Sequence, residues 1–254
     1  MATSEEIVRK IRESCSSKGL ECYPFKVQWY NDKVQPAFHL SYSPNTLGVL
    51  IVSCPSMFER LFIPYLSSSD FKRVGQLDPL DQCLRDEMHR IKENLFPHHK
   101  VDIMQDFELH PASRRPKVLV QTMGHISGAA RYYQRSDVDP DPWDEKEKIY
   151  GVSVHPKFGG WFALRGVMIF QDILAPELIQ KEPEDCIPSR ELRIELLEKF
   201  NRHWQDWSYR DVSGTGIEER YSREQKEYFG TEPRLRSDLI DTLRLRYQLG
   251  TAVN

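Results

Sequence analysis

The sequence lacks any segment that would carry it into or across a membrane. Its longest apolar run, Leu47 to Cys54, includes a serine and has the length of one strand, whereas a membrane-spanning helix needs about 20 apolar residues. The N-terminus reads Met-Ala-Thr-Ser-Glu-Glu, without the basic start and apolar stretch of a secretory signal. We therefore expect no membrane partner and no secretory signal.

Cysteine is sparse and scattered, and no two cysteines form a C-x-x-C pair. An odd number without such pairs argues against a disulfide framework and against structural zinc. Unpaired thiols suit a reducing compartment, so we expect a cytoplasmic protein with no metal site of its own. The five cysteines are Cys15, Cys22, Cys54, Cys83 and Cys186.

An excess of basic charge is also missing. The 35 Lys and Arg are outweighed by 38 Asp and Glu, for a formal net charge of −3. Because a nucleic-acid-binding surface is normally basic, we expect no nucleic-acid partner.

Standard catalytic motifs are missing too. The sequence contains no G-x-S-x-G elbow, no H-E-x-x-H zinc motif, no P-loop and no G-x-G-x-x-G after a strand. The adjacent pair His98-His99 is a weak metal candidate, because neighbouring side chains on a strand point to opposite faces. No catalytic side chain is therefore predicted.

What the sequence does contain is the mixture of strand and helix patterns of an α+β protein. Thr3-x-x-Glu6 is a capping box that opens an amphipathic helix to about Ser16, and Asp78-Pro79 opens another helix. A further helix is expected after Pro55, with others at 189–207, 222–229 and 237–249. Strands are expected at 21–30, 47–54, 101–109, 117–121, 149–154 and 161–170.

An acidic connector interrupts this pattern late in the chain. It is punctuated by Pro176, Pro183 and Pro188, and the sequence beyond it is helical and charged. We therefore predict a boundary near Glu182, between an α+β body (1–182) and a helical cap (183–254).

The densest candidate site begins with His125-Ile-Ser-Gly128, followed by two alanines and the aromatic pair Tyr132 and Tyr133. Small residues let a flat ligand approach the backbone, and aromatic rings stack against it. The same composition also serves the packing of a helix against a sheet. Both interpretations stay open from these residues alone.

A second candidate segment, 158–166, combines bulky aromatics, three glycines and Arg165. The turn 155–160 predicts that strands 149–154 and 161–170 form a hairpin, because paired glycines permit positive φ. Arg165 lies in an otherwise apolar strand, so its charge should be paired or face a cavity, unless it reaches solvent from the strand end.

A third segment contains Trp204 and Trp207, which would share one face of a helix and pin the cap to the body. Arg210 follows, and its simplest partner is Asp206 or Asp211. Together the three segments predict an aromatic, glycine-rich pocket lined by arginine under a helical cap. That outline fits a cofactor-dependent reductase.

Short strings of unusual composition occur in order along nearly the whole chain. They are Tyr23-Pro-Phe-x-Val-x-Trp29-Tyr-Asn, Pro36-Ala-Phe-His-Leu40, Arg114-Arg-Pro-Lys, His125-x-x-Gly-Ala-Ala, Tyr132-Tyr-Gln-Arg, Asp139-Pro-Asp-Pro-Trp143, His155-Pro-x-Phe-Gly-Gly-Trp-Phe-Ala-x-Arg-Gly166, His203-Trp-x-Asp-Trp-x-Tyr-Arg-Asp211 and Glu219-Arg-Tyr-Ser-x-Glu-Gln-Lys226. Each string is weak alone, but the ordered set resembles the methylmalonic aciduria and homocystinuria type C family of cobalamin-processing proteins.

The resemblance implies a flavin-reductase or nitroreductase-like α+β fold with a mostly antiparallel sheet, flanking helices and a C-terminal helical cap. It implies base-off binding of cobalamin, in which the lower benzimidazole is detached from cobalt. Two reactions are implied: reductive removal of cyanide from cyanocobalamin by a reduced flavin (FMN or FAD) that NADPH supplies, and transfer of the alkyl group of alkylcobalamins to glutathione.

The resemblance also implies partners and an oligomeric state. Other cobalamin-trafficking proteins, such as the type D protein and methionine synthase, are the implied partners, and the chain would be a monomer or a ligand-linked homodimer. The alternatives are a non-catalytic cobalamin escort and a flavin-dependent nitroreductase-like enzyme.

Site residues follow from the same resemblance. Arg165, Arg210 and Arg236 match the glutathione-binding arginines, with Arg234 as a competitor for the last position, and arginine suits the two carboxylates of glutathione. The string His125-x-x-Gly128 resembles the Asp-x-His-x-x-Gly signature of cobalamin-dependent mutases, in which the histidine binds cobalt. Met123 stands where that signature has its orienting Asp, so His125 is expected to shape the pocket without binding cobalt. The implied cobalamin-binding residues are Leu119, His125, Gly128, Tyr132, Tyr133, Gln134, Gly159, Gly160, Trp161 and Phe162.

Overall fold

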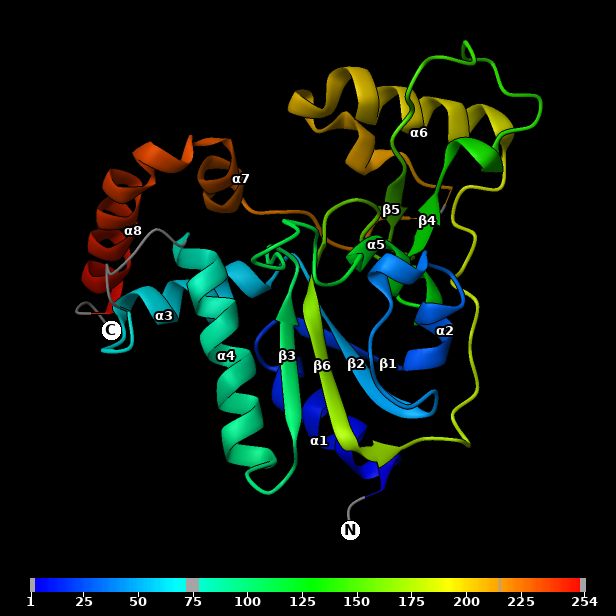
Figure 1. The fold of residues 1–254 in the computed structure, drawn as a ribbon. Coiled ribbons are helices and arrows are strands. Elements are labelled where there is room, and N and C mark those ends of the chain that lie inside the picture. The colour runs from blue at the N-terminus through cyan, green and yellow to red at the C-terminus, as the bar shows by residue number, and fades with distance from the viewer. Residues whose placement is uncertain (1–2, 72–77, 215, 252–254) are drawn as a thin grey trace.

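A computed structural model describes residues 3–71, 78–214 and 216–251. It is an α+β structure built on a four-stranded sheet of order β1-β2-β6-β3, in which every neighbouring pair is antiparallel (Figure 1). The strands are β1 Leu20–Lys26, β2 Thr46–Ser53, β3 Val101–Gln105 and β6 Ala163–Leu174. A separate two-stranded sheet pairs β4 Arg131–Tyr133 with β5 Val152–Val154.

Eight α-helices surround these sheets in the described part of the chain. Their bounds are α1 Ser4–Ser16, α2 Val27–Asn31, α3 Ile63–Ser67, α4 Pro79–Leu95, α5 Val120–Ile126, α6 Arg190–His203, α7 Arg223–Gly230 and α8 Arg236–Thr251. A π-helical turn, Phe58–Phe62, runs directly into α3. None of the described helices is long and apolar enough to cross a bilayer.

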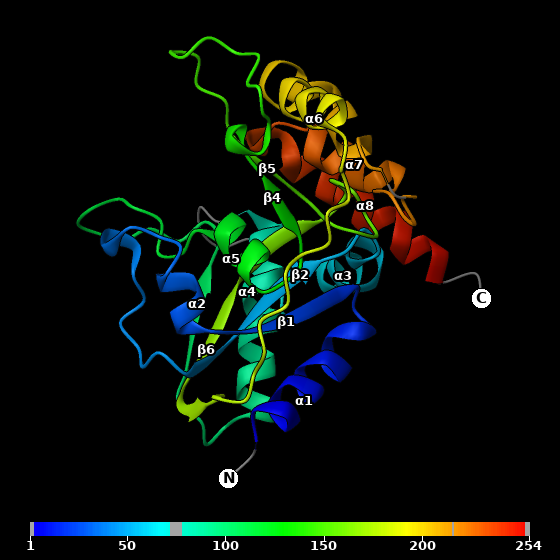
Figure 2. The same cartoon turned by 90° about the vertical axis from the view of Figure 1, so that its right-hand side faces the viewer.

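Strand β2 separates two layers of the core. Its residues are buried throughout, and successive side chains of a strand point to opposite faces. Leu47 and Ile51 thus pack into a cluster with α1 and α4, whereas Leu50 and Val52 pack into a cluster with α2 and α5. Figure 2 shows α1 and α5 on opposite sides of the sheet.

Several helix boundaries confirm the predicted capping signals. The hydroxyl of Thr3 accepts a hydrogen bond from the N–H of Glu6 at the start of α1. The carboxylate of Asp78 accepts one from the N–H of Leu80 at the start of α4. Ser222 caps α7 through the N–H of Gln225. Each cap satisfies a backbone donor that the helix itself leaves free.

The predicted hairpin between strands 149–154 and 161–170 is wrong. Strand β5 pairs with β4, whereas β6 pairs with β2 and β3, and a single bridge between His155 and Gly159 closes the turn that separates β5 and β6. The reason lies in burial: residues 164–170 are buried on both faces of β6, and a strand of that kind belongs between two apolar partners.

Three further boundaries differ from the sequence-based expectation. The segment expected as a strand at 117–121 leads into α5, whose buried residues Met123 and Ile126 have helical spacing. The strand expected at 21–30 ends at Lys26, where α2 follows. The helix expected to run to Trp207 ends at His203.

Because α6 ends early, Trp204 and Trp207 do not share a helix face. Trp204 is 57% exposed, and Trp207 has a left-handed backbone (φ 62°) between two 3-10 turns.

The C-terminal helices join two different parts of the core. Tyr228 of α7 and Leu243 of α8 enter the cluster that α1 and α4 form. Leu196 and Leu197 of α6 instead pack with β4 and β5 in a third cluster. In Figure 1, α6 accordingly lies over β5, at a distance from α7 and α8. The division at residues 182 and 183 stays a prediction.

Candidate functional site

Two adjoining hollows, both lined by Gly151, form what we call the Gly151 cleft. One has a volume of about 570 Å³ and the other about 250 Å³. Of the residues predicted to bind cobalamin, Tyr132 and Gln134 line the first hollow, and Gly160 and Phe162 line the second. The cleft therefore brings together residues from the two predicted segments 125–134 and 158–166.

Other predicted cobalamin residues have different surroundings. Tyr133 is fully buried in the third cluster, where its hydroxyl donates to Asp185 and accepts from the N–H of Ile187. Leu119 packs against the cluster around α2 and α5. Trp161 is buried, and its indole N–H donates to Asp211 over 2.9 Å.

His125 lies in the last turn of α5 and lines neither hollow of the cleft. Its Nδ1 accepts a hydrogen bond from the N–H of Tyr132 over 3.2 Å, and its Nε2 is 3.8 Å from a carboxylate oxygen of Glu182. Burial lowers the pKa of His125, which favours the neutral ring. This geometry fits the predicted shaping role, since the ring fixes where β4 begins.

No grouping of three or more metal-ligating side chains exists among residues 3–71, 78–214 and 216–251. His99, one of the weak metal candidates, is instead paired with Asp172, with 2.9 Å between Nδ1 and Oδ2.

Gly159 and Gly160 form a cradle for the backbone of Arg210. The N–H of Gly160 donates to the carbonyl of Arg210 over 2.9 Å. A Cβ at position 160 would lie 2.7 Å from Cα of Arg210, and one at position 159 would lie 2.7 Å from its carbonyl oxygen. The paired glycines therefore admit the 3-10 turn Ser208–Asp211 against the loop 155–162. The sequence showed the glycines but not their partner.

The expected ion pair between Arg210 and Asp206 or Asp211 is wrong. Arg210 donates through Nη1 to the carbonyl of Gly160. Asp211 is bound by Trp161 and by Arg220, whose Nε lies 2.8 Å from Oδ1. Arg210 itself lines the smaller hollow of the Gly151 cleft.

Arg165 is 6% exposed and is held by side chains of the body. Its Nε donates to the hydroxyl of Ser53 over 2.8 Å. Asp81 and Asp106 lie near enough for the charge of Arg165 to act on the pKa of each carboxyl group. Burial raises the pKa of Asp81 to about 6, with Arg165 opposing and Asp78 and Asp106 reinforcing that rise. Arg165 therefore does not reach solvent from the strand end, and its side chain is hydrogen-bonded inside the body with two carboxylates nearby.

Arg236 is anchored to the first turn of α4. Its Nη1 lies 2.5 Å from Oδ2 of Asp78, and Tyr228 donates to the other oxygen of that carboxylate over 2.7 Å. Arg234 is 80% exposed and pairs locally with Glu232. Of the two competing positions, Arg236 is therefore the one that faces the body.

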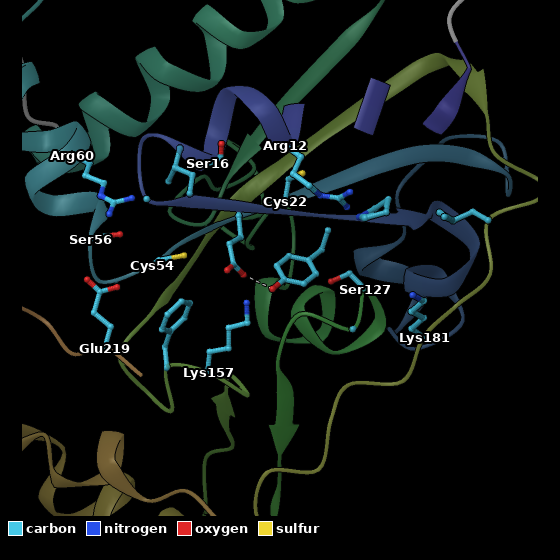
Figure 3. Close-up of a pocket in the computed structure, with 18 of the residues that line it drawn as sticks. Arg12, Ser16, Cys22, Cys54, Ser56, Arg60, Ser127, Lys157, Lys181 and Glu219 are labelled. Atoms are coloured by element: carbon cyan, nitrogen blue, oxygen red, sulfur yellow. Dashed lines mark hydrogen bonds between the residues drawn. The ribbon is translucent and has the colours of Figure 1, made fainter. Parts of the chain in front are cut away.

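A third hollow, which we call the β1 pocket, has a volume of about 710 Å³ (Figure 3). Four cationic side chains and two carboxylates line it, together with aromatic and apolar residues. In Figure 3, Arg60 and Glu219 lie at one end and Lys181 at the other. The lining residues used below are Arg12, Glu21, Tyr23, Trp29, Gly128, Lys157, Phe158 and Lys181.

A hydrogen-bonded cluster forms one wall of the β1 pocket. Nδ1 of buried His155 accepts from the N–H of Lys157 over 3.1 Å, so the ring proton belongs on Nε2. Nε2 lies 3.3 Å from Glu21 and 3.1 Å from the hydroxyl of Tyr23, which donates to Glu21.

Burial alone would raise the pKa of Glu21, but the hydrogen bonds from His155 and Tyr23 outweigh it and hold the pKa at about 2. Glu21 is therefore a fixed carboxylate at neutral pH. Sequence reasoning missed this pocket because its residues come from α1, β1, α2, the segment that follows α5, the loop 155–162 and the connector.

The family model of the methylmalonic aciduria and homocystinuria type C family matches residues 19–240. A Gallus gallus protein named cyanocobalamin reductase / alkylcobalamin dealkylase is 48% identical over 240 residues, which cover 94% of this chain and 98% of that protein. The Homo sapiens protein of the same name is 47% identical over 235 residues, covering 92% of this chain and 81% of that one.

A solved structure is also similar. The crystal structure of CblC, described as a B12-trafficking protein of Caenorhabditis elegans and a homologue of human MMACHC, aligns with a TM-score of 0.83 at 32% identity. The alignment covers 94% of this chain and 96% of that chain. The predicted α+β fold, with its mostly antiparallel sheet, flanking helices and C-terminal helices, is confirmed by this similarity.

Proposed function

The chain belongs to the methylmalonic aciduria and homocystinuria type C family, and we propose on that premise that it is a cyanocobalamin reductase and alkylcobalamin dealkylase. The observation that carries the proposal is the match of nearly the whole chain to relatives named for both activities. Cobalamin is the substrate, and its processing fits a reducing cytoplasm, since the five cysteines are free and buried.

The Gly151 cleft is the proposed site of the corrin ring. One polar atom of a residue that lines it, Oγ of Ser153, is buried without a hydrogen-bond partner. A buried polar group without a partner costs free energy, and the amide side chains around a corrin would satisfy such groups. Tyr132 and Phe162 supply aromatic faces beside the ring.

The β1 pocket is the proposed site of the lower nucleotide of cobalamin. Gly128, one of the predicted cobalamin residues, lines it together with Trp29 and Phe158, which offer apolar surface to a detached benzimidazole. Lys181 and Arg12 supply positive charge for the phosphate of that nucleotide. Holding the base here leaves cobalt with one donor fewer, which stabilises the reduced metal and eases electron transfer.

Glutathione is the proposed acceptor of the alkyl group. Arg165, Arg210 and Arg236 would bind its carboxylates through charge-assisted hydrogen bonds and lower the pKa of its thiol through their field. The thiolate forms a bond with the alkyl carbon, the cobalt–carbon bond breaks, and its electron pair stays on cobalt as Co(I). Positioning is the main catalytic contribution of the protein, so no protein nucleophile is needed.

For decyanation, a reduced flavin, FMN or FAD, recharged by NADPH would supply the electrons. The type D protein and methionine synthase are the proposed protein partners, as further members of the same trafficking route.

The test is to incubate purified protein anaerobically with methylcobalamin and glutathione, and separately with cyanocobalamin, flavin and NADPH. S-methylglutathione with Co(I)alamin is expected in the first reaction, and cyanide with reduced cobalamin in the second. Tight cobalamin binding without either product would overturn the proposal in favour of a non-catalytic escort.

A further inference from the structure

The guanidinium group of Arg210 lies inside a cage of four aromatic rings. Its central carbon is 5.1 Å from the ring centroid of Tyr209, 5.2 Å from Tyr221, 5.6 Å from Trp207 and 5.7 Å from Trp161. Aromatic faces attract a cation at such distances. The charge of Arg210 is thus compensated by rings, while the neighbouring carboxylate of Asp211 is bound by Trp161 and Arg220.

Trp207, which supplies one ring of the cage, has a strained backbone conformation. Trp207 adopts φ 62°, the left-handed region that large side chains rarely occupy. Its carbonyl accepts from the N–H of Arg210 over 3.0 Å, and its ring packs edge-on against Trp161 and Tyr221, at 6.0 and 6.4 Å between centroids. Strained residues of this kind persist where the surroundings require them and concentrate at functional sites.

A second feature of Arg210 is its position beside a hollow. Nη1 donates to the carbonyl of Gly160, whereas Nε is buried without a partner. Arg210 lines the smaller hollow of the Gly151 cleft. Its guanidinium is therefore the positive charge that an anionic group entering this hollow would meet.

We propose that Trp207 is a positioning residue for alkyl transfer, which holds the guanidinium of Arg210 so that its positive charge faces a carboxylate of glutathione in the smaller hollow of the Gly151 cleft. The inference rests on the proposed function and assigns to Trp207 a role that acts entirely through Arg210. Removing the ring therefore weakens the use of glutathione and leaves the chemistry at cobalt in place.

The experiment compares methyl transfer from methylcobalamin to glutathione in the wild type and in Trp207→Asn. Asparagine tolerates the left-handed backbone, so the variant removes the ring without adding strain. We expect the KM for glutathione to rise about tenfold, as one cation–π contact allows, while kcat changes much less. Trp207→Phe, which keeps an aromatic face, is expected to restore most of the lost affinity.

Two controls separate positioning from a general structural effect. Trp204→Asn removes the same type of side chain three residues earlier, where it is exposed, and is expected to leave the KM for glutathione unchanged. In an Arg210→Gln background, Trp207→Asn should add no further rise in KM, because a residue that acts through Arg210 has nothing left to position.

The possible outcomes are distinct. Additive effects of the Trp207 and Arg210 substitutions, or equal effects of Trp204→Asn and Trp207→Asn, overturn the positioning role while the proposed function stands. A wild type that transfers no methyl group to glutathione overturns both. If Trp207→Asn lowers the melting temperature strongly, Trp207→Gly provides a second variant without the ring, since glycine adopts this backbone freely.

Discussion

Some charged side chains of this molecule are buried, so partners must offset the free-energy cost of removing their charge from water. Arg165 lies inside the apolar strand β6, yet Ser53 accepts its Nε–H and two carboxylates lie nearby. Glu21 is likewise held as a carboxylate by Tyr23 and His155. A charge removed from water persists only with such partners, so substitutions at these positions test both stability and function.

Replacing the arginines should separate the two reactions. We expect Arg165→Gln and Arg210→Gln each to weaken glutathione-dependent dealkylation about tenfold to a hundredfold, since one charge-assisted hydrogen bond is worth roughly 1.5–3 kcal/mol. Decyanation needs an electron donor and no thiol, so it should suffer less. Both activities and the melting temperature are measured on each variant. Equal loss of both activities at an unchanged melting temperature would show that the arginines serve a shared site.

Glu21→Gln tests the electrostatics of the β1 pocket. The pKa of Glu21 is lowered from 4.5 to about 2, so its contribution to stability is present above pH 4.5 and is lost as the pH falls toward 2. We expect the substitution to lower the free energy of unfolding at pH 7 by about 1–3 kcal/mol, and by somewhat less than half as much at pH 3. Urea denaturation at both pH values checks this, and a deficit of equal size at pH 3 and pH 7 would contradict it.

His125→Ala tests the shaping role of that ring. We expect weaker cobalamin binding, because the ring no longer fixes the start of β4 through Tyr132, while the bound vitamin stays base-off. The measurement is the electron paramagnetic resonance spectrum of the Co(II) form. A nitrogen hyperfine signal from histidine in the wild type that disappears in the variant would identify His125 as a cobalt ligand.

At the scale of elements, the loop 155–162 joins the body to the turn that carries Arg210. Gly160→Ala should displace this turn, because the new Cβ would lie 2.7 Å from a backbone atom of Arg210. We expect a loss of about 1–3 kcal/mol in the free energy of unfolding, and a larger fractional loss of dealkylation than of decyanation.

Gly230→Ala is the matched control for this substitution. A Cβ at position 230 meets no atom within 4 Å, so its stability and both activities should stay close to those of the wild type. If Gly160→Ala behaved like Gly230→Ala, the turn would not depend on the paired glycines.

Elements with strong local signals were predictable from the sequence, and elements decided by distant partners were not. The caps Thr3, Asp78 and Ser222 mark helix starts through their own hydrogen bonds, and β2 is a nearly continuous apolar run. The partner of β6 depends on which apolar strands lie beside it, so the local turn 155–160 suggested the wrong hairpin.

For the whole molecule, the site is assembled from segments that are far apart in the chain. The Gly151 cleft joins residues near 132, 160 and 210, and two of these segments carried visible aromatic and glycine patterns. The β1 pocket is built from isolated side chains such as Arg12, Glu21 and Lys181, which form no pattern along the sequence. The Gly151 cleft was therefore predictable in outline from the sequence, whereas the β1 pocket was not.

The measurement that tests the central claim most directly is the visible absorption spectrum of methylcobalamin or cyanocobalamin on addition of the purified protein. The claim is that the chain binds cobalamin with the lower base held away from cobalt. The predicted result is a blue shift of the bound vitamin to its base-off form. A bound vitamin that keeps its base-on spectrum would contradict the claim, and with it the assignment of the β1 pocket to the lower nucleotide.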